Sequence, residues 1–192
     1  MELRLEEYRQ LSEELRIYLK QREFNITTAR IVTFAAFTTS FSSLSKNYLL
    51  LAEIILIISA FFVLVMWYDS IRRLLAMFRI STYLIVFYEQ EYQGLQWHSL
   101  VAQHKIHKTI LHRILGNAMF PIMAFSLLAF SNYLGFNNLK FQNHEIILYT
   151  LDILFLILIV LLIKESLNLE NRRKQDIEFW NKLKKDFPNK PL

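Results

Sequence analysis

Two acidic residues lie inside long apolar stretches of the chain, and they are the first candidates for chemistry. Glu53 is the one charged residue in Tyr48–Tyr68, and Asp152 is the one charged residue between Ile146 and Ile163. Burying a charge in a bilayer is costly, so intramembrane acids face a bundle interior, a partner or a water-filled path. Arg30, near the start of a Thr- and Ser-rich stretch, is a third intramembrane ionisable residue. These groups are either carriers of protons or ions, or hydrogen-bonded structural residues.

The histidines raise the question of a metal site. His104, His107 and His112 follow one another at spacings of three and five, which turns them towards one side of a helix. Basic residues are interleaved with them, and no nearby carboxylate completes a ligand set of the usual kind. We therefore expect no metal and no cofactor.

The chain carries no recognisable catalytic motif. It has no HExxH, GxSxG, phosphate-binding loop or dinucleotide fingerprint, and the absence of Cys excludes disulfides and thiolate chemistry. Its basic residues are interspersed with acids outside any nucleic-acid-binding module, so we expect no nucleic acid partner. The sequence predicts a protein that is not an enzyme.

The elements that must position these residues are helices that cross a membrane. The 192 residues are 54% hydrophobic and include three Gly and three Pro, too few turn formers for a sandwich or barrel. About 20 apolar residues cross a bilayer as a helix. We therefore expect an all-α, integral membrane four-helix bundle with cytoplasmic amphipathic helices. Its spans form two hairpins, 26–68 and 115–163, with spans at about 26–44, 48–68, 115–134 and 145–163.

The distribution of basic residues predicts the orientation. Of 22 Lys and Arg, only Lys46 and Lys140 fall in the two loops that join spans within a hairpin. Cytoplasmic loops carry the excess of Lys and Arg, so both termini and the middle connection are expected in the cytoplasm. The sequence predicts a multi-pass protein of a bacterial inner membrane.

Three segments are expected on the cytoplasmic side. Residues 1–25 form a charged helix whose outer face, including Glu7, is expected to be solvated. Its apolar seam, made by Tyr8, Leu11, Leu15 and Tyr18, needs a partner in this chain or in a neighbouring subunit. Residues 69–114 are amphipathic helices that continue from the second span, and residues 164–192 are a basic helical tail suited to anionic lipid. Interfacial basic residues at the headgroup level are Arg72, Arg73 and Arg79.

The first span is the most polar of the four. Ala35, Thr39 and Ser43 recur every four residues and form a small-residue face that allows close helix packing or lines a pore. Its hydroxyls are expected to bond back to the helix's own carbonyl groups. We expect this span to sit centrally in the bundle or to line a cavity.

Two stretches resemble a set of small bacterial four-span membrane proteins of uncharacterised function. They are the opening EYRQLSEELRIYLKQRE and the segment RRLLAMFRISTYLIVFYEQEYQGLQW, which ends in the turn Gly94-Leu95-Gln96-Trp97. Some proteins of similar layout are accessory or effector subunits of antiphage systems, including CRISPR-associated ones. The resemblance implies a place in such a system and brings no catalytic residue with it.

Three functions remain open from the sequence. The first is an oligomeric membrane-perturbing or sensing subunit, in which cytoplasmic helices receive a signal. The second is a passive anchor or scaffold, with a cytoplasmic protein partner on the terminal helices. The third is a small proton- or ion-coupled carrier that uses Glu53 and Asp152. The expected partners are the lipid bilayer and further copies of the chain.

Overall fold

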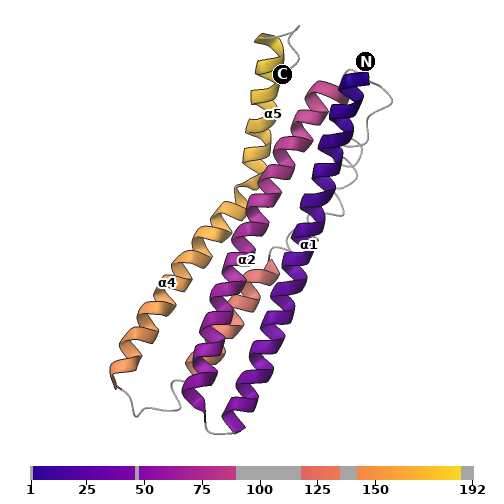
Figure 1. Ribbon diagram of the computed structural model, residues 1–192. Coiled ribbons are helices and arrows are strands. Elements are labelled where there is room, and N and C mark those ends of the chain that lie inside the picture. Colours follow the sequence, from indigo (N-terminus) through magenta and orange to yellow (C-terminus); the bar gives the residue numbers. More distant parts are fainter. Residues whose placement is uncertain (1, 46–47, 90–117, 135–141, 187–192) are drawn as a thin grey trace. The chain divides into compact units, whose positions relative to one another are not determined.

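The computed structural model describes residues 2–45, 48–89, 118–134 and 142–186, and these form helices and no strand (Figure 1). The expected all-α fold class is therefore confirmed for the described residues. The helices are α1 (Glu2–Ser45), α2 (Leu49–Leu84), the π-helix η1 (Ile85–Glu89), an unlabelled helix over Ala118–Leu134, α4 (Gln142–Leu167) and α5 (Leu169–Asp186).

The chain divides into two compact units. Unit 1 comprises Met1–Arg22, Ile71–Arg113 and Ser166–Leu192, and unit 2 comprises Glu23–Ser70 and Ile114–Glu165. Helices α1 and α2 contribute residues to both units. Neither helix contains Gly or Pro, the two residues that most readily interrupt a helix. The 44 residues of α1 accordingly form one helix, and α2 continues past the second expected span, as predicted.

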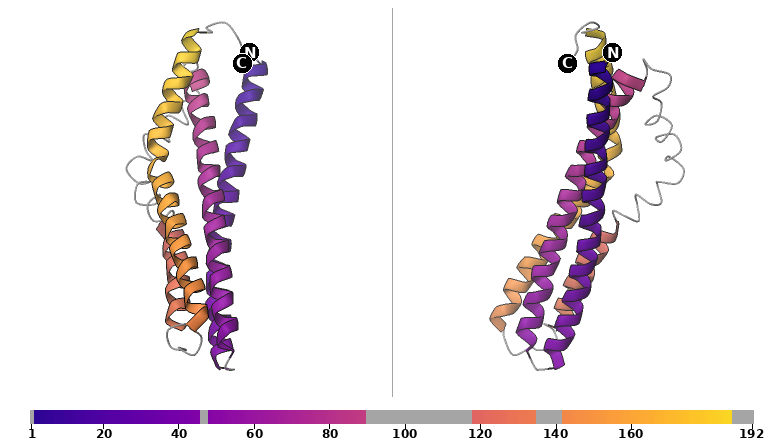
Figure 2. Two further views of the ribbon diagram at one scale, coloured as in Figure 1. Left: turned by 90° about the vertical axis from the view of Figure 1, so that its left-hand side faces the viewer. Right: turned by 45° about the vertical axis from the view of Figure 1, so that its right-hand side comes forward.

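In unit 2, α2 has contacts with all three other helices. The Ser40 hydroxyl of α1 donates to the Ala52 carbonyl of α2 at 3.3 Å, and both views in Figure 2 show these helices side by side within the unit. The Trp67 ring stacks on Phe120 of the Ala118–Leu134 helix, with ring centroids 6.5 Å apart. Phe61 meets Phe155 of α4 edge to face. Helix α2 therefore packs against each of the other described helices of this unit, and so does the Ala118–Leu134 helix, whose Phe130 ring lies 5.1 Å from that of Phe41 in α1.

The expectation that the first span sits centrally is wrong for the single chain. Small residues of α1 do pack inside unit 2, where Ala29, Ala36 and Ser40 are almost fully buried. The opposite face carries Phe34, which is 76% exposed, and the exposed Ala35 and Thr39. The threonines do not need a central position because Thr33, Thr38 and Thr39 donate to carbonyls of their own helix at 2.7–2.8 Å. The predicted back-bonding is thus confirmed.

One described helix, Leu49–Tyr88, is long and apolar enough to cross a membrane. Only 33% of its most apolar window is buried, so it is not the enclosed core helix of this chain. The helix over Ala118–Leu134 is apolar and shorter. The finding covers the second expected span and leaves the other three as predictions.

In unit 1, the partner of the N-terminal seam is another part of the same chain. Leu15 of α1, Leu84 of α2 and Tyr88 of η1 form a buried cluster, against which Tyr8 and Leu11 pack. Figures 1 and 2 show α5 alongside the second half of α2 within this unit. The sequence left open whether the seam packs against this chain or against a neighbouring subunit. The structure shows that it packs against this chain.

The α1–α2 contact in unit 2 can be tested at Ser40. Replacing it by Leu inserts a large side chain where α1 meets the Ala52 carbonyl, and overpacking with loss of the hydrogen bond costs about 2–4 kcal/mol. We expect a lower melting temperature for Ser40→Leu in detergent, followed by circular dichroism. Ser42→Leu, a matched change at an exposed position of the same helix, should melt like the unaltered protein. Equal melting temperatures for all three would contradict this packing.

Candidate functional site

Asp152, the acid that the sequence favoured for function, has a partner on another helix of unit 2. The Asn132 side chain, in the Ala118–Leu134 helix, hydrogen bonds to the Asp152 carboxylate of α4, and both residues are half-buried. Glu53 on α2 is also half-buried and has a partner of its own. Each acid therefore has a partner, as burial of a polar group requires.

A second polar contact joins α1 to α2 in the same unit. The Asn25 amide, which is 5% exposed, donates to the Asp69 carboxylate at 2.8 Å. Together with the Ser40 hydrogen bond, this contact gives two polar interactions between α1 and α2. The two α1 residues are 15 positions apart. Arg30 lies on the exposed side of α1, where its guanidinium contacts the Met119 sulfur at 3.0 Å.

The small-residue face predicted in the first span is divided by the structure. Ser43 is buried in unit 2, whereas Ala35 and Thr39 are exposed. These two residues share their face with large apolar side chains, Ile31, Phe34 and Phe41. The exposed part of the predicted face is therefore available to lipid or to a second copy.

Unit 1 contains a polar and aromatic cluster around the π-helix. The Glu7 carboxylate of α1 accepts hydrogen bonds from the Tyr83 hydroxyl at 3.1 Å and from the Tyr88 hydroxyl. Burial raises the pKa of the Tyr88 hydroxyl above its usual range, and the hydrogen bond to Glu7 adds to the rise. Glu7 therefore does not belong to a solvated face, which corrects that expectation.

Helix α5 also packs against this cluster. The Trp180 ring meets the rings of Tyr83 and Phe87 edge to face, with centroids 5.2 and 6.1 Å apart. The Lys184 ammonium donates to the Val86 carbonyl at 2.7 Å. Because Val86 belongs to the π-helical turn, this hydrogen bond ties α5 to η1. At least one lysine of the basic tail thus serves packing within unit 1.

The remaining seam and basic residues lie in unit 1. The Tyr18 hydroxyl donates to Glu14 at 3.0 Å, and this bond raises the pKa of Tyr18. The Arg73 guanidinium donates to the Gln21 side chain, Arg72 is exposed, and Arg79 lines a pocket beside α5. His104, His107 and His112 lie outside the described residues. In the part of the chain that the structure describes, no group of three potential metal-ligating side chains occurs.

Sequence reasoning missed Asn132 and the pair Glu7 and Lys184. Asn132 lies near the end of an uncharged span, where its amide was a signal for a hydrogen-bond partner. Glu7 precedes Tyr8 of the apolar seam, and its position beside a seam residue was the available signal. Lys184 gave none, because its acceptor is a backbone carbonyl 98 positions away in the sequence.

Comparison with known proteins adds no relative to this description. The chain matches no family model, no curated protein and no solved structure. Its function is therefore argued from the two units alone.

The Tyr88 contact predicts a pH dependence of stability. Because the folded state holds the pKa of Tyr88 above its unfolded value, the protonated hydroxyl stabilises the fold fully below pH 10, and this contribution is lost as pH rises above 10. We expect the stability of the unaltered protein to fall more steeply above pH 10 than that of Tyr88→Phe. The difference in slope should approach about 1.4 kcal/mol per pH unit. Unfolding in denaturant at pH 7–11 measures both slopes, which should agree below pH 9. Parallel curves over the whole range would show that Tyr88 is not held in this way.

Proposed function

We propose that the protein is a four-span, multi-pass membrane protein that acts without catalysis as an oligomeric sensing or membrane-perturbing subunit. Unit 2 is its membrane part and unit 1 its cytoplasmic part. The four spans, the inner membrane and the oligomer belong to this proposal. So does a role in defence against phage, which the resemblance to small bacterial membrane proteins implies.

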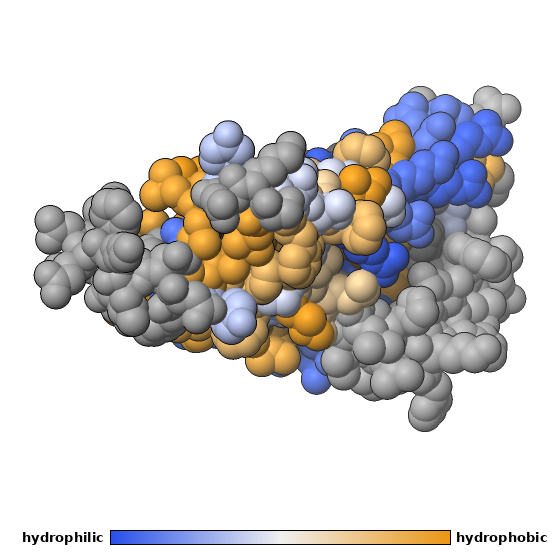
Figure 3. Space-filling model, turned by 90° about the horizontal axis from the view of Figure 1, so that it is seen from below, coloured by the Kyte–Doolittle hydropathy of each residue, from blue (hydrophilic) through white to orange (hydrophobic). Residues whose placement is uncertain are grey.

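The observation that carries the proposal is the apolar exterior of unit 2. Each of its four helices exposes large apolar side chains, for which Phe34, Ile58, Phe125 and Val160, at 59–76% exposure, are examples. The exposed positions of α2 from Leu50 to Tyr68 are all apolar or aromatic, and Figure 3 shows hydrophobic side chains gathered on one face of the molecule. Soluble monomers rarely expose apolar patches of this extent, so a hydrocarbon environment accounts for this surface.

Unit 1 has the opposite distribution. The exposed positions of its helices are rich in charge, including Arg9, Glu13 and Lys20 of α1 and Lys174 and Glu178 of α5. Its interior is apolar and aromatic, as in a water-soluble helical bundle. This contrast between the units favours a membrane-embedded part and an aqueous part in one chain.

The sensing role rests on the helices that belong to both units. In unit 1, α5 and the start of α1 both hold η1, through Lys184 and Glu7. A ligand or partner that changes this packing acts directly on α1 and α2. The same two helices contact each other in unit 2 through Ser40 and Ala52. A change of packing in unit 1 can therefore bias how the spans pack.

A second candidate is a small proton- or ion-coupled carrier, and the Asn132–Asp152 pair favours it. A carboxylate in a membrane that is held by one amide retains acceptor capacity for a proton or cation. The scaffold alternative is weaker, because the seam expected to dock a partner is occupied by the chain's own α2 and η1.

The membrane topology can be tested by cysteine labelling, since the chain has no native Cys. We expect Lys46→Cys and Lys140→Cys to react with an impermeant maleimide in intact spheroplasts. Lys20→Cys and Lys182→Cys should react only after permeabilisation, because basic segments stay in the cytoplasm. Labelling of position 46 or 140 on the same side as position 20 would contradict the four-span arrangement.

The sensing or perturbing role can be tested with a potential-sensitive dye. If copies meet through the exposed α1 face, expression depolarises cells, and Ala35→Leu reduces the effect by preventing close approach of helices. Ala129→Leu, the same change at an exposed position of the Ala118–Leu134 helix, is the matched control.

The same assay separates the alternatives. If the protein is a carrier, its effect on the membrane potential depends on Asp152. The variant Asp152→Asn then abolishes the proton or ion flux, although the protein still assembles. A scaffold leaves the potential unchanged in every variant. Equal effects of Ala35→Leu and Ala129→Leu would contradict a role for the α1 face.

A further inference from the structure

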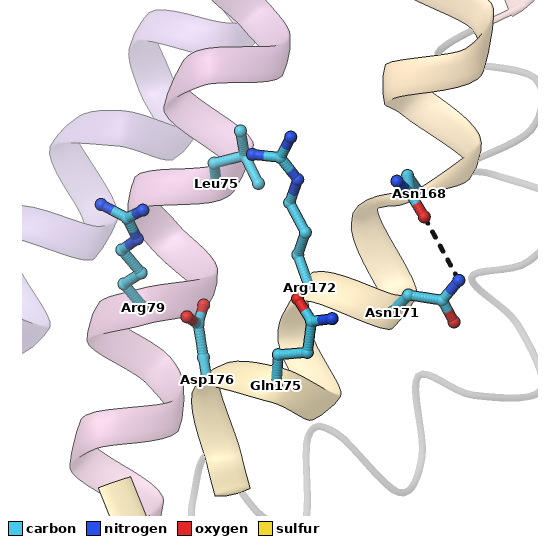
Figure 4. A pocket seen from close by; sticks show the side chains of 7 residues that line it. All are labelled: Leu75, Arg79, Asn168, Asn171, Arg172, Gln175 and Asp176. Atoms are coloured by element: carbon cyan, nitrogen blue, oxygen red, sulfur yellow. Dashed lines mark hydrogen bonds between the residues drawn. The ribbon is translucent and has the colours of Figure 1, made fainter. Parts of the chain in front are cut away.

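A polar pocket lies between α2 and α5 in unit 1, outside the packing and the contacts described above. Its volume is about 360 Å³, within the range of small-molecule sites. Figure 4 shows its side chains, which come from one stretch of α2, from Asn168 between α4 and α5, and from the first turns of α5. They are Leu75, Arg79, Asn168, Asn171, Arg172, Gln175 and Asp176.

Helical spacing explains why these residues meet. Leu75 and Arg79 are four apart, and Asn168 and the α5 residues recur at intervals of three and four, so each set lies on one side. The packing of α5 uses another stripe, in which Arg173 lies 5.9 Å from the centre of the Phe78 ring and Trp180 meets Tyr83. The polar stripe therefore lies beside the residues whose contacts attach α5 to α2.

The pocket presents more hydrogen-bond donors than acceptors. Arg79 and Arg172 each bring a guanidinium with five N–H groups, the geometry that suits phosphate oxygens. The Asn171 amide donates to the Asn168 side-chain oxygen at 3.2 Å, which leaves the Asn168 amide hydrogens as donors. The carboxylate of Asp176 is the one acidic group among the lining residues.

The charges of the lining select the kind of anion. Two guanidinium groups and one carboxylate leave a single positive charge, which a phosphodiester with one negative charge balances. A phosphate monoester carries about −1.5 to −2 at pH 7 and would meet repulsion from Asp176. The same carboxylate, with Gln175, can accept hydrogen bonds from hydroxyl groups beside the phosphate. The complementary ligand is thus a phosphodiester that bears hydroxyl groups.

The position along the chain fits either of two sources. Helix α2 is unbroken, so Leu75 lies about 10 Å along its axis from Tyr68, where the second span is expected to end. Asn168 follows the expected end of the fourth span by five residues, about 7 Å. Lipid headgroups reach this level from the bilayer, and dissolved phosphodiesters reach it from the cytoplasm.

We propose that the pocket between α2 and α5 binds a hydroxyl-bearing phosphodiester through Arg79 and Arg172, and that this ligand is the signal received by unit 1. The proposal deepens the sensing role and rests on it for the placement of the spans. A ligand in the pocket contacts both α2 and α5. Its α2 contacts, Leu75 and Arg79, come shortly before η1 in the sequence.

The test uses the full chain purified in detergent, with phosphatidylglycerol and the water-soluble glycerophosphoglycerol as probes. Phosphatidylcholine serves as the zwitterionic control. We expect saturable thermal stabilisation by at least one of the two probes, because a ligand that binds the folded state raises its stability. Stabilisation by phosphatidylglycerol alone assigns the lipid as source. Stabilisation by glycerophosphoglycerol, with or without the lipid, assigns the headgroup chemistry itself. No saturable effect of either probe overturns the proposal.

Matched variants separate the pocket from a generally basic surface. Arg79→Gln and Arg172→Gln should each raise the half-saturating concentration by at least about fivefold, and Asp176→Asn should lower it. Lys174→Gln removes one positive charge at an exposed position of α5 that does not line the pocket, and it should stay within about twofold, since exposed charges act weakly. Equal losses in Lys174→Gln and the arginine variants overturn the pocket.

Retention in the membrane distinguishes this proposal from the proposed function. Membranes that contain each variant are washed at alkaline pH, which removes peripheral proteins. Retained protein without probe binding means that the pocket proposal fails and the membrane placement stands. Extraction of the unaltered protein by the wash means that the placement itself fails.

Discussion

The structure depends on how unit 2 satisfies its buried polar groups within the chain. A buried polar group without a hydrogen-bond partner costs free energy, and several polar side chains of this unit find their partners within the chain. Thr33, Thr38 and Thr39 bond to their own helix, Ser40 to the next helix, and Asn132 to Asp152. Trp67 Nε1 and Ser70 Oγ are buried without a partner, which places two unmet groups one turn apart on α2.

This internal satisfaction allows polar residues to occur at the exposed face of α1. A threonine whose hydroxyl is already bonded presents mainly its methyl group to the surroundings. The predicted central position of the first span assumed that hydroxyl content requires shielding by other helices. The structure shows the alternative solution, in which the helix backbone supplies the acceptors and the bulky Phe34 and Phe41 share the exposed face.

The sequence was informative where one physical signal dominates. The length and apolar composition of α2 identified it as a span candidate, and the spacing of Tyr8, Leu11 and Leu15 identified a seam that packs. Contacts between elements distant in the sequence were not predictable, because periodicity defines a face and not what covers it. The partner of Glu7 lies 76 and 81 positions away. To predict the pocket between α2 and α5, one would have to know that these two helix faces pack together, and periodicity does not give that information.

The packing of unit 2 also limits how the protein can act on a membrane. The side chains of Trp67, Phe120, Leu56 and Leu127 are each less than 2% exposed and fill the space between its helices. A polar path through the middle of a single unit would have to displace these large groups, at a cost of several kcal/mol for each side chain. If the protein perturbs the membrane, the path therefore lies between copies of the chain. The exposed face with Ala35 and Thr39 is the surface where small residues allow such a contact.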